Sequence, residues 1–415
     1  MEELCLCKSG KKYKNCCFKK SSLGFQLNLK GEKAEDFVYS LSIESFFIDW
    51  CYRNITLQKG KEICDLLIVF DNIAIIWQIK DLKIHKDGKY KSSEVQKNLD
   101  QLITARNRLF GLKIPIDIEN PRRGKETFNP KNIDEIYLIS ALIGEDEDYC
   151  SFIEKRDGHI IHTFTRSFME IALNELNTMK DFIEYLRKKE DLISIGNKIQ
   201  IMGGEEELLA WYLNDGRSFE KFKKADFIIL DDGSWEKIRK KPEFLAKKKL
   251  DEISYGWDEI INTAHTSGTK EYEIVARELA RTSRFERRCL SQAFYDAHVM
   301  AHKETKNSFH RILVFYDRTY CFVFSDEINP REKRQALLSA ICFIGRGKYQ
   351  ENKRVIGIAT EMKIRPKCSY DFCFLDIPNW TEKEQKEMEQ LQEVTGFFKN
   401  PKEVKIHQDE YPEMS

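Results

Sequence analysis

The stretch EICDLLIVFDNIAIIWQIKD, residues 62–81, decides the fold of the first half of this 415-residue chain. It contains two apolar runs, 66–70 and 73–79, in which isoleucine and valine favour β-strands. The pair Asp71-Asn72 stands between the runs and tolerates the positive φ angles of a two-residue hairpin turn. The stretch therefore predicts two antiparallel strands joined by a tight turn.

Polar side chains interrupt this apolar hairpin at one end. Side chains alternate across a strand, so Gln78 and Lys80 emerge on the same face. Glu62 and Asp65 begin the neighbouring strand, and a turn at 71–72 brings them to the same end of the sheet. Carboxylate and amide oxygens suit Mg²⁺ or Mn²⁺. Such a cation activates water and neutralises charge during phosphodiester hydrolysis, and a lysine beside it polarises the water or the phosphate.

Asp65, followed by Gln78-Ile79-Lys80, resembles the D…(D/E/Q)xK signature of the PD-(D/E)xK nuclease superfamily. The glutamine is similar to that of Mrr-like restriction endonucleases, and the resemblance covers roughly residues 30–145. It implies an α/β fold with a restriction-endonuclease-like core built on a mixed sheet. It also implies DNA as the substrate and bacterial anti-phage defence as the setting, although the residues themselves do not exclude RNA.

The resemblance implies a role for each residue of the signature. Asp65 ligates Mg²⁺ or Mn²⁺, Gln78 ligates it through its carbonyl oxygen or holds a metal-bound water, and the backbone carbonyl of Ile79 completes the shell. Lys80 orients the attacking water. The usual pattern has a carboxylate in place of Gln78, so the second metal ion of a two-metal mechanism is in doubt.

Two further carboxylates are candidates for the site. The first helix of the superfamily often donates an acidic residue, and Glu35 lies in the helix expected within 30–54. Glu62 compensates for the missing carboxylate if its side chain reaches the metal ion. The plainer interpretation is that Glu62 and Asp65 are solvated residues at a strand end and that Glu35 lies on an exposed helix surface.

Four cysteines near the N-terminus have the spacing C-x-C, eight residues, C-C: Cys5, Cys7, Cys16 and Cys17. Two close pairs of thiols joined by a short loop can surround one tetrahedral Zn²⁺. The pattern is similar to the SEC-C motif, named for the C-terminal tail of the SecA translocase. This resemblance implies a structural zinc knob that docks a protein partner or assists nucleic-acid binding. The alternative is a thiol-rich tail without metal.

The segments around the hairpin are expected to complete an α/β core in the order helix, hairpin, helix, strand. Apolar residues recur at helical spacing within 30–54, where residues 49–54 are expected to lead into a loop, and again in 95–110. The apolar run 133–143 predicts a buried strand parallel to its neighbours. Basic residues in two connecting loops are candidates for nucleic-acid binding, although a solvated surface explains them equally well: Lys83, Lys86, Arg122 and Arg123.

The composition limits the function classes. The chain has 68 basic and 68 acidic residues, so any nucleic-acid-binding surface must be local. It contains no run of about 20 apolar residues that would span a membrane, and no P-loop. The acidic N-terminus is not a signal peptide. Twelve cysteines without an export signal indicate thiols and metal ligands, which predicts a cytoplasmic protein.

The composition also shifts along the chain, and this predicts six parts. They are a SEC-C-like zinc motif at 1–22, a nuclease-like domain at 28–165, a helical connector at 166–200, a mainly helical basic region at 201–305, a small α/β module at 306–400 and a polar tail at 401–415. Within the basic region, lysines of 237–249 are interleaved with aromatic residues. This pattern suits nucleic-acid contact and a helical surface over buried rings equally well.

Two further functions compete with a nuclease. The first is a nuclease fold that has lost catalysis and binds nucleic acid or a protein partner through the zinc motif and the basic helices. Gln78, at a position usually held by a carboxylate, is its best argument. The second, weaker one is an adaptor of the ribosome or the translocon that acts through the zinc motif. The oligomeric state is open, and a homo-oligomer is among the expectations.

Overall fold

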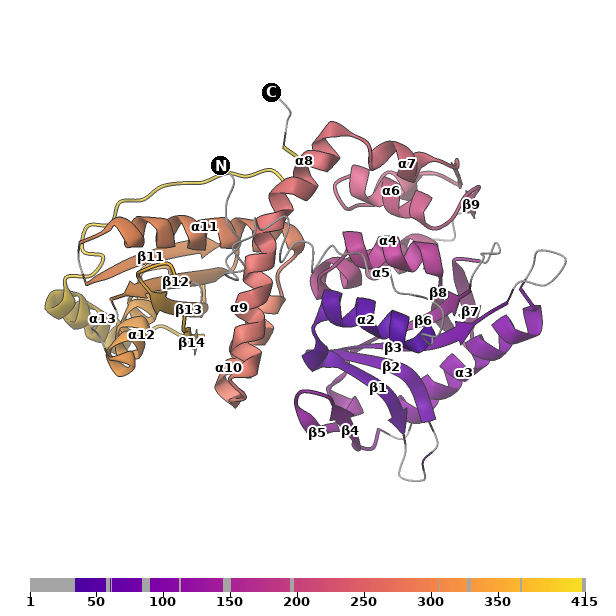
Figure 1. Ribbon diagram of the computed structural model, residues 1–415, viewed down its shortest axis with the longest axis horizontal. Coiled ribbons are helices and arrows are strands. Elements are labelled where there is room, and N and C mark those ends of the chain that lie inside the picture. The colour runs from indigo at the N-terminus through magenta and orange to yellow at the C-terminus, as the bar shows by residue number, and fades with distance from the viewer. Residues whose placement is uncertain are drawn as a thin grey trace. The chain divides into compact units, whose positions relative to one another are not determined.

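In the computed structural model, the described residues form two compact units, 34–246 and 247–412, with the boundary inside helix α8 (Pro242–Asp251) (Figure 1). The cysteines of the predicted zinc motif and Lys86 lie outside the described residues. The described ranges are 34–56, 60, 62–83, 90–111, 113–144, 151–194, 198–305, 307–326, 330–365 and 368–412.

A six-stranded mixed sheet is the centre of the N-terminal unit, with the strand order β1–β2–β3–β6–β8–β7. The α/β fold class with a mixed sheet agrees with the prediction. The elements are α2 (Ala34–Phe46), η2 (Ile48–Trp50), β1 (Cys51–Thr56), β2 (Glu62–Phe70), β3 (Ile73–Asp81), α3 (Ser92–Phe110), β4 (Ile116–Asn120), β5 (Gly124–Phe128), η3 (Pro130–Asn132), β6 (Glu135–Ile143), β7 (Ile153–Arg156), β8 (His159–Thr165), α4 (Arg166–Glu175), α5 (Met179–Ser194), β9 (Lys198–Ile201), α6 (Glu206–Asn214), η4 (Phe222–Lys224), β10 (Phe227–Leu230) and α7 (Ser234–Ile238), followed by α8.

The predicted hairpin is confirmed. Strands β2 and β3 pair antiparallel up to Phe70 opposite Ile73, so that Asp71 and Asn72 form the turn. Asp71 has a φ angle of 55°, a conformation that aspartate and asparagine tolerate better than most residues. Helix α3 then leads to β6, which lies parallel to both β3 and β8. The apolar run 133–143 is therefore the buried parallel strand that its composition predicts.

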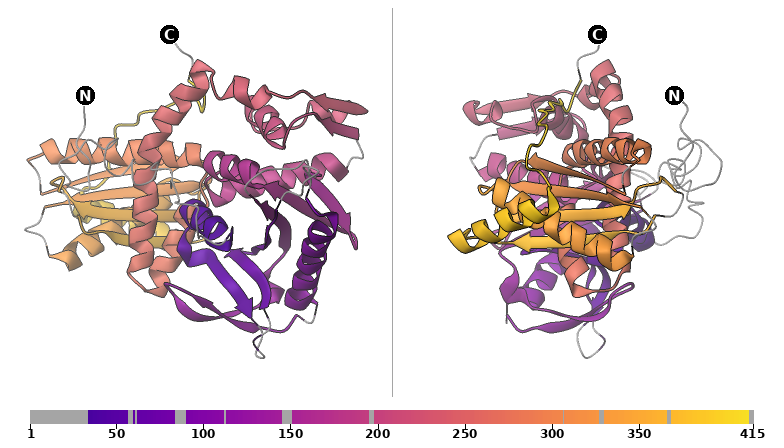
Figure 2. Two further views of the ribbon diagram at one scale, coloured as in Figure 1. Left: turned by 45° about the vertical axis from the view of Figure 1, so that its right-hand side comes forward. Right: turned by 90° about the vertical axis from the view of Figure 1, so that its left-hand side faces the viewer.

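Helices cover both faces of this sheet (Figures 1 and 2). Helix α3 packs on one face, where Leu99 and Leu102 are buried with Leu67 and Ile76 of the hairpin. Helices α2, α4 and α5 lie on the other face, around the buried ring of Trp77. This ring stacks on Phe182 of α5, with 6.1 Å between the centroids, and meets Phe164 of β8 edge to face. Burial on both faces explains why the hairpin is almost continuously apolar.

The first helix is shorter than the sequence predicts. Helix α2 ends at Phe46, and Phe47 has a φ angle of 66°, which no α-helix accommodates. After the short turn η2, residues Cys51–Thr56 form strand β1, which pairs antiparallel with β2. The prediction of a helix over 30–54 is therefore wrong beyond residue 46, and residues 51–54, which are expected to lead into a loop, belong to this strand. The apolar and aromatic residues of this segment extend the sheet instead.

A four-stranded sheet with the order β11–β12–β13–β14 is the centre of the C-terminal unit. Strands β11 and β12 form an antiparallel hairpin, and α12 leads from it to β13, which lies parallel to β12. The elements after α8 are η5 (Glu252–Ser254), α9 (Tyr255–Thr266), α10 (Lys270–Ala280), α11 (Arg284–Lys303), β11 (Ser308–Phe315), β12 (Arg318–Ser325), α12 (Arg331–Lys348), β13 (Arg354–Glu361), β14 (Asp371–Asp376) and α13 (Glu382–Thr395).

Replacing Trp77 by alanine is expected to lower the free energy of unfolding by about 3–5 kcal/mol, because a fully buried aromatic ring leaves a cavity. The matched control is Trp211→Ala, since this ring is 39% exposed and its loss should change the free energy by about 1 kcal/mol or less. Urea titrations of the full chain, followed by far-UV circular dichroism, measure both values. Equal effects of the two substitutions would contradict the central place of Trp77 in the core.

Candidate functional site

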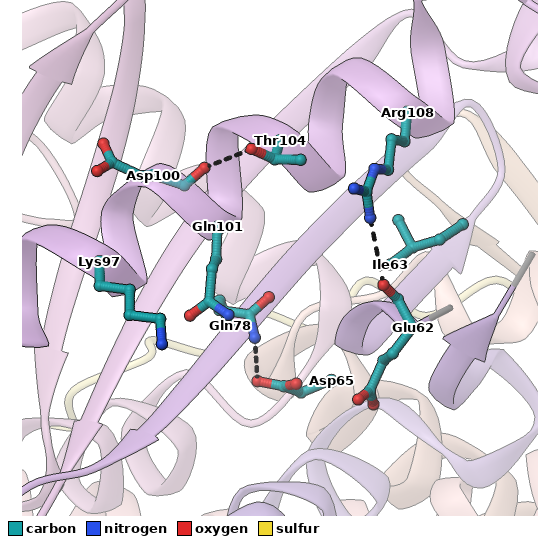
Figure 3. Close-up of a pocket in the computed structure, with 9 residues that line it drawn as sticks. All are labelled: Glu62, Ile63, Asp65, Gln78, Lys97, Asp100, Gln101, Thr104 and Arg108. Carbon is teal, nitrogen blue, oxygen red and sulfur yellow. Dashed lines mark hydrogen bonds between the residues drawn. The ribbon is translucent and has the colours of Figure 1, made fainter. Parts of the chain in front are cut away.

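A pocket of about 340 Å³ lies between the hairpin and helix α3 (Figure 3). Three of the predicted site residues, Glu62 and Asp65 of β2 and Gln78 of β3, form one wall of it. The complete lining is Glu62, Ile63, Asp65, Gln78, Lys97, Asp100, Gln101, Thr104 and Arg108. The hairpin thus brings the acidic start of one strand beside the polar end of the next, as the sequence predicts.

The carboxylate of Asp65 is held from one side. Its Oδ2 atom accepts hydrogen bonds from the backbone N–H of Ile79 at 2.5 Å and from Nε2 of Gln78 at 2.8 Å. Among the described residues, no donor reaches Oδ1. The residue is only 7% exposed, so most of the hydration of the carboxylate is lost. One oxygen is therefore fixed by the fold, and the other stays available to a ligand in the pocket.

The electrostatics of Asp65 follow from this burial. Burial raises the pKa of Asp65 to about 6. The hydrogen bond from the N–H of Ile79 lowers this pKa, whereas the negative charges of Glu62 and Glu35 raise it. Burial and the charge of Glu35 also raise the pKa of Glu62. Glu35 lies on α2, a different element from the hairpin. The structure therefore brings the three predicted carboxylates close enough to act on one another.

Asn98 of α3 fixes the position of Gln78. Its Nδ2 atom donates to the backbone oxygen of Gln78 at 3.3 Å and to Oγ of Ser140 on β6 at 2.8 Å. Asn98 is 1% exposed, so these bonds connect α3, β3 and β6 inside the core. The sequence analysis missed this residue. The available signal is a polar residue within the apolar stripe of the helix, next to Leu99.

The predicted lysines lie outside the pocket lining. Lys80 is half-buried and follows Gln78 by two residues on the same strand, so it shares a face with it. It forms no ion pair with any described residue. Lys83 is exposed just after the strand. Lys80 is therefore near the site along β3 and keeps its charge available.

The predicted arginines of the β4–β5 turn are bound within the fold. Arg122 donates to Oδ2 of the buried Asp49 at 2.7 Å. Arg123 pairs with Glu126, whose other oxygen accepts from the hydroxyl of Tyr52. Neither arginine lines the pocket. These contacts attach the β4–β5 hairpin to η2 and β1, and a role of the two arginines in nucleic-acid binding stays a prediction.

Helix α3 supplies the other wall of the pocket; the sequence predicts this helix but not the cations that it places there. Lys97, Gln101, Thr104 and Arg108 recur at helical spacing and line the pocket opposite Asp65 (Figure 3). The apolar periodicity of α3 identifies the face that packs on the sheet. It leaves the polar face indistinguishable from an ordinary solvated surface.

The donors in the pocket fit a hard divalent cation. A carboxylate oxygen of Asp65, the amide oxygen of Gln78 and the carboxylate of Glu62 are the oxygen ligands that Mg²⁺ and Mn²⁺ accept. In the described part of the chain, no group of three or more His, Cys, Asp or Glu side chains is placed to hold a metal ion. A cation here would therefore depend on Gln78 and on the backbone carbonyl of Ile79, beside the carboxylates.

Comparison with known proteins identifies one motif. Residues 3–19 match the SEC-C motif, and this span contains all four cysteines of the predicted zinc site. Searches of curated proteins and of solved structures gave no match. No helix within the described ranges is long and apolar enough to cross a membrane. Residues 3–19 lie outside the described part of the chain, and the match assigns no function to the pocket.

Replacing Asp65 by asparagine is expected to stabilise the metal-free protein at pH 7.5 by up to about 3 kcal/mol. The pKa of about 6 in the folded chain lies above the ordinary 3.8, so the folded chain keeps a proton that the unfolded chain releases between these values. The stability of the wild type therefore falls as pH rises from about 4 to 6. The difference of about two pH units corresponds to about 3 kcal/mol.

Urea titrations in EDTA at pH 4.0 and 7.5 measure this effect. The gain from Asp65→Asn should be large at pH 7.5 and small at pH 4.0. Asp117→Asn is the matched control, because Asp117 lies exposed on β4. A substitution at Asp65 that stabilises equally at both pH values, or not at all, would rule out the burial of an ionised carboxylate.

Proposed function

We propose that this chain is a metal-dependent nuclease that hydrolyses phosphodiester bonds, with DNA as the expected substrate, in the pocket between the hairpin and α3. One observation carries the proposal. Asp65 is buried at the end of an apolar hairpin, bonded to Gln78 and to the backbone of Ile79, with a raised pKa and one oxygen available to a ligand. A buried carboxylate with a raised pKa in a pocket is typical of a functional site.

The chain order around the pocket supports the proposal. The resemblance to the PD-(D/E)xK superfamily implies a helix, a hairpin, a second helix and a strand. These correspond to α2, β2–β3, α3 and β6, with β1 added before the hairpin and β4–β5 added after α3. Glu35 of α2 acts electrostatically on Asp65, as expected of the acidic residue that the first helix donates. The signature, the order of elements and this coupling are three separate features that point to the same function.

The residues of the chain would act as follows. Asp65, Gln78 and the carbonyl of Ile79 would hold Mg²⁺ or Mn²⁺, with Glu62 as a further carboxylate in the same pocket. The cation, when bound, lowers the pKa of a water and offsets the charge that develops on the phosphate. Lys80, two residues after Gln78 on the same strand, would donate a hydrogen bond that orients a water at this site. Because the pKa of Asp65 is about 6, a cation displaces a proton from it only at acidic pH.

The alternative is a nuclease fold without catalysis that binds nucleic acid or a protein. Gln78 at a carboxylate position favours it. The basic segment 237–249 does not, because its aromatic neighbours Trp235 and Phe244 are buried against each other, with ring centroids 6.0 Å apart. Buried rings cannot stack on bases.

The nuclease assay uses the purified full chain with labelled DNA and, in parallel, labelled RNA. Cleavage should require Mg²⁺ or Mn²⁺ and stop in EDTA. Asp65→Ala and Lys80→Ala should each slow cleavage by about 100-fold or more, because each removes a charge that acts on the reacting water. Asp117→Ala and Lys113→Ala are matched controls, since both residues are exposed outside the pocket. Binding without cleavage in every metal would establish the alternative.

We further propose that the SEC-C motif at 3–19 holds structural zinc through its four thiolates. The purified chain should contain about one Zn²⁺ per molecule by elemental mass spectrometry. Substituting Cys5 and Cys16 by serine together should remove it, whereas Cys368→Ser, at a half-buried thiol elsewhere, should not. Retention of zinc in the double variant would contradict this assignment.

A further inference from the structure

The polar face of α3 carries two cations into the candidate site. Lys97 and Arg108 line the pocket at its two ends, and Figure 3 shows them on opposite sides of Asp65 and Gln78. They are 11 residues apart on one helix, so their backbones are about 16 Å apart along its axis. Between them, Gln101 and Thr104 present neutral polar groups to the same pocket, and Asp100 presents a carboxylate that pairs with Arg156.

Both cations keep their charge available. Within the described residues, neither Lys97 nor Arg108 forms an ion pair, although Glu62 lines the same pocket. Arg108 donates only to the backbone oxygen of Glu62, at 3.4 Å. By contrast, Arg156 pairs with the carboxylate of Asp100, which also lines the pocket. Lys97 and Arg108 therefore have no carboxylate partner within the described residues and can contact a ligand.

A phosphate that approaches Asp65 and Glu62 is repelled by their carboxylates unless positive charge offsets the repulsion. A small phosphodiester reaches one end of the pocket only. A polynucleotide strand presents a phosphate about every 3.4 Å along a B-form axis, so it offers separate phosphates to two cationic side chains whose backbones are about 16 Å apart on α3. The spacing of the two cations suits an extended chain of phosphates.

We infer that α3 binds the backbone of a polynucleotide strand, with Lys97 and Arg108 contacting phosphates on either side of the bond that lies at Asp65 and Gln78. Gln101 donates to a phosphate or sugar oxygen between them, whereas the hydroxyl of Thr104 already donates to the backbone oxygen of Asp100 at 2.8 Å. This inference rests on the proposed nuclease function and specifies its substrate class. The substrate is an internal bond of a strand of several nucleotides.

Binding in EDTA tests the inference separately from catalysis. Fluorescence anisotropy with labelled 20-mers of single-stranded DNA, duplex DNA and RNA gives the slope of log affinity against log salt concentration. Lys97→Ala and Arg108→Ala should each reduce this slope by about 1, because each removes one phosphate contact. Arg106→Ala is the matched control, since Arg106 lies on α3 outside the pocket lining. Circular dichroism confirms folding of each variant.

A second measurement uses the wild type in Mn²⁺ with a 20-mer and with a dinucleotide. The dinucleotide should be cleaved at least about tenfold more slowly, because it cannot reach both cations. Wild-type slopes in both pocket variants, or equal cleavage of the two substrates, would overturn the role of α3 and leave the nuclease intact. Absence of any cleavage, with the reduced slopes present, would overturn the nuclease and retain the binding surface.

Discussion

The carboxylate of Asp65 is the group on which the rest of the candidate site depends. Hydrogen bonds from Ile79 and Gln78 fix one of its oxygens, yet burial still raises its pKa to about 6. The two donors therefore do not replace all the hydration that the carboxylate loses on folding. A bound divalent cation would supply the missing stabilisation. Burial of Asp65 thus lowers the stability of the metal-free protein and would favour binding of a cation. Such a loss of stability at a functional site is common in proteins.

The C-terminal unit shows that such a hairpin does not need this carboxylate. Its strands β11 and β12 pair antiparallel, and α12 leads to a parallel strand, as α3 does in the N-terminal unit. The two hairpins can be aligned on the last residue pair before each turn, Phe70–Ile73 and Phe315–Arg318. In this alignment, His310 occupies the position of Asp65 and Val323 the position of Gln78. Val323 is fully buried. The arrangement therefore folds with an apolar residue at the position of Gln78, and the polar pair calls for a functional explanation.

The sequence predicts the hairpin, α3 and β6 because each carries a local apolar period. It does not predict β1, because Cys51–Thr56 continues the apolar pattern of α2 and only pairing with β2 decides its conformation. Asp65 and Gln78 are predictable together because a tight turn joins their strands. The position of Lys97 and Arg108 beside the site is not predictable from the sequence. It depends on how α3 packs on the sheet, and this packing includes a hydrogen bond from Asn98 to Ser140, which lies 42 residues further along the chain.

Gln78 has a physical reason to be neutral. Its Nε2 atom lies 2.8 Å from Oδ2 of Asp65, and two carboxylates this close cannot both be ionised. Glu62 and Glu35 already raise the pKa of Asp65, so a third negative charge on β3 would weaken the metal-free hairpin further. The amide of Gln78 carries no charge, so it donates a hydrogen bond to Asp65 where a carboxylate would repel it. Its amide oxygen would still be able to bind a hard cation. If the proposed nuclease function holds, Glu35 of α2 and Glu62 of β2 would supply the negative charge that Gln78 lacks, and the glutamine would be compatible with catalysis at a single cation.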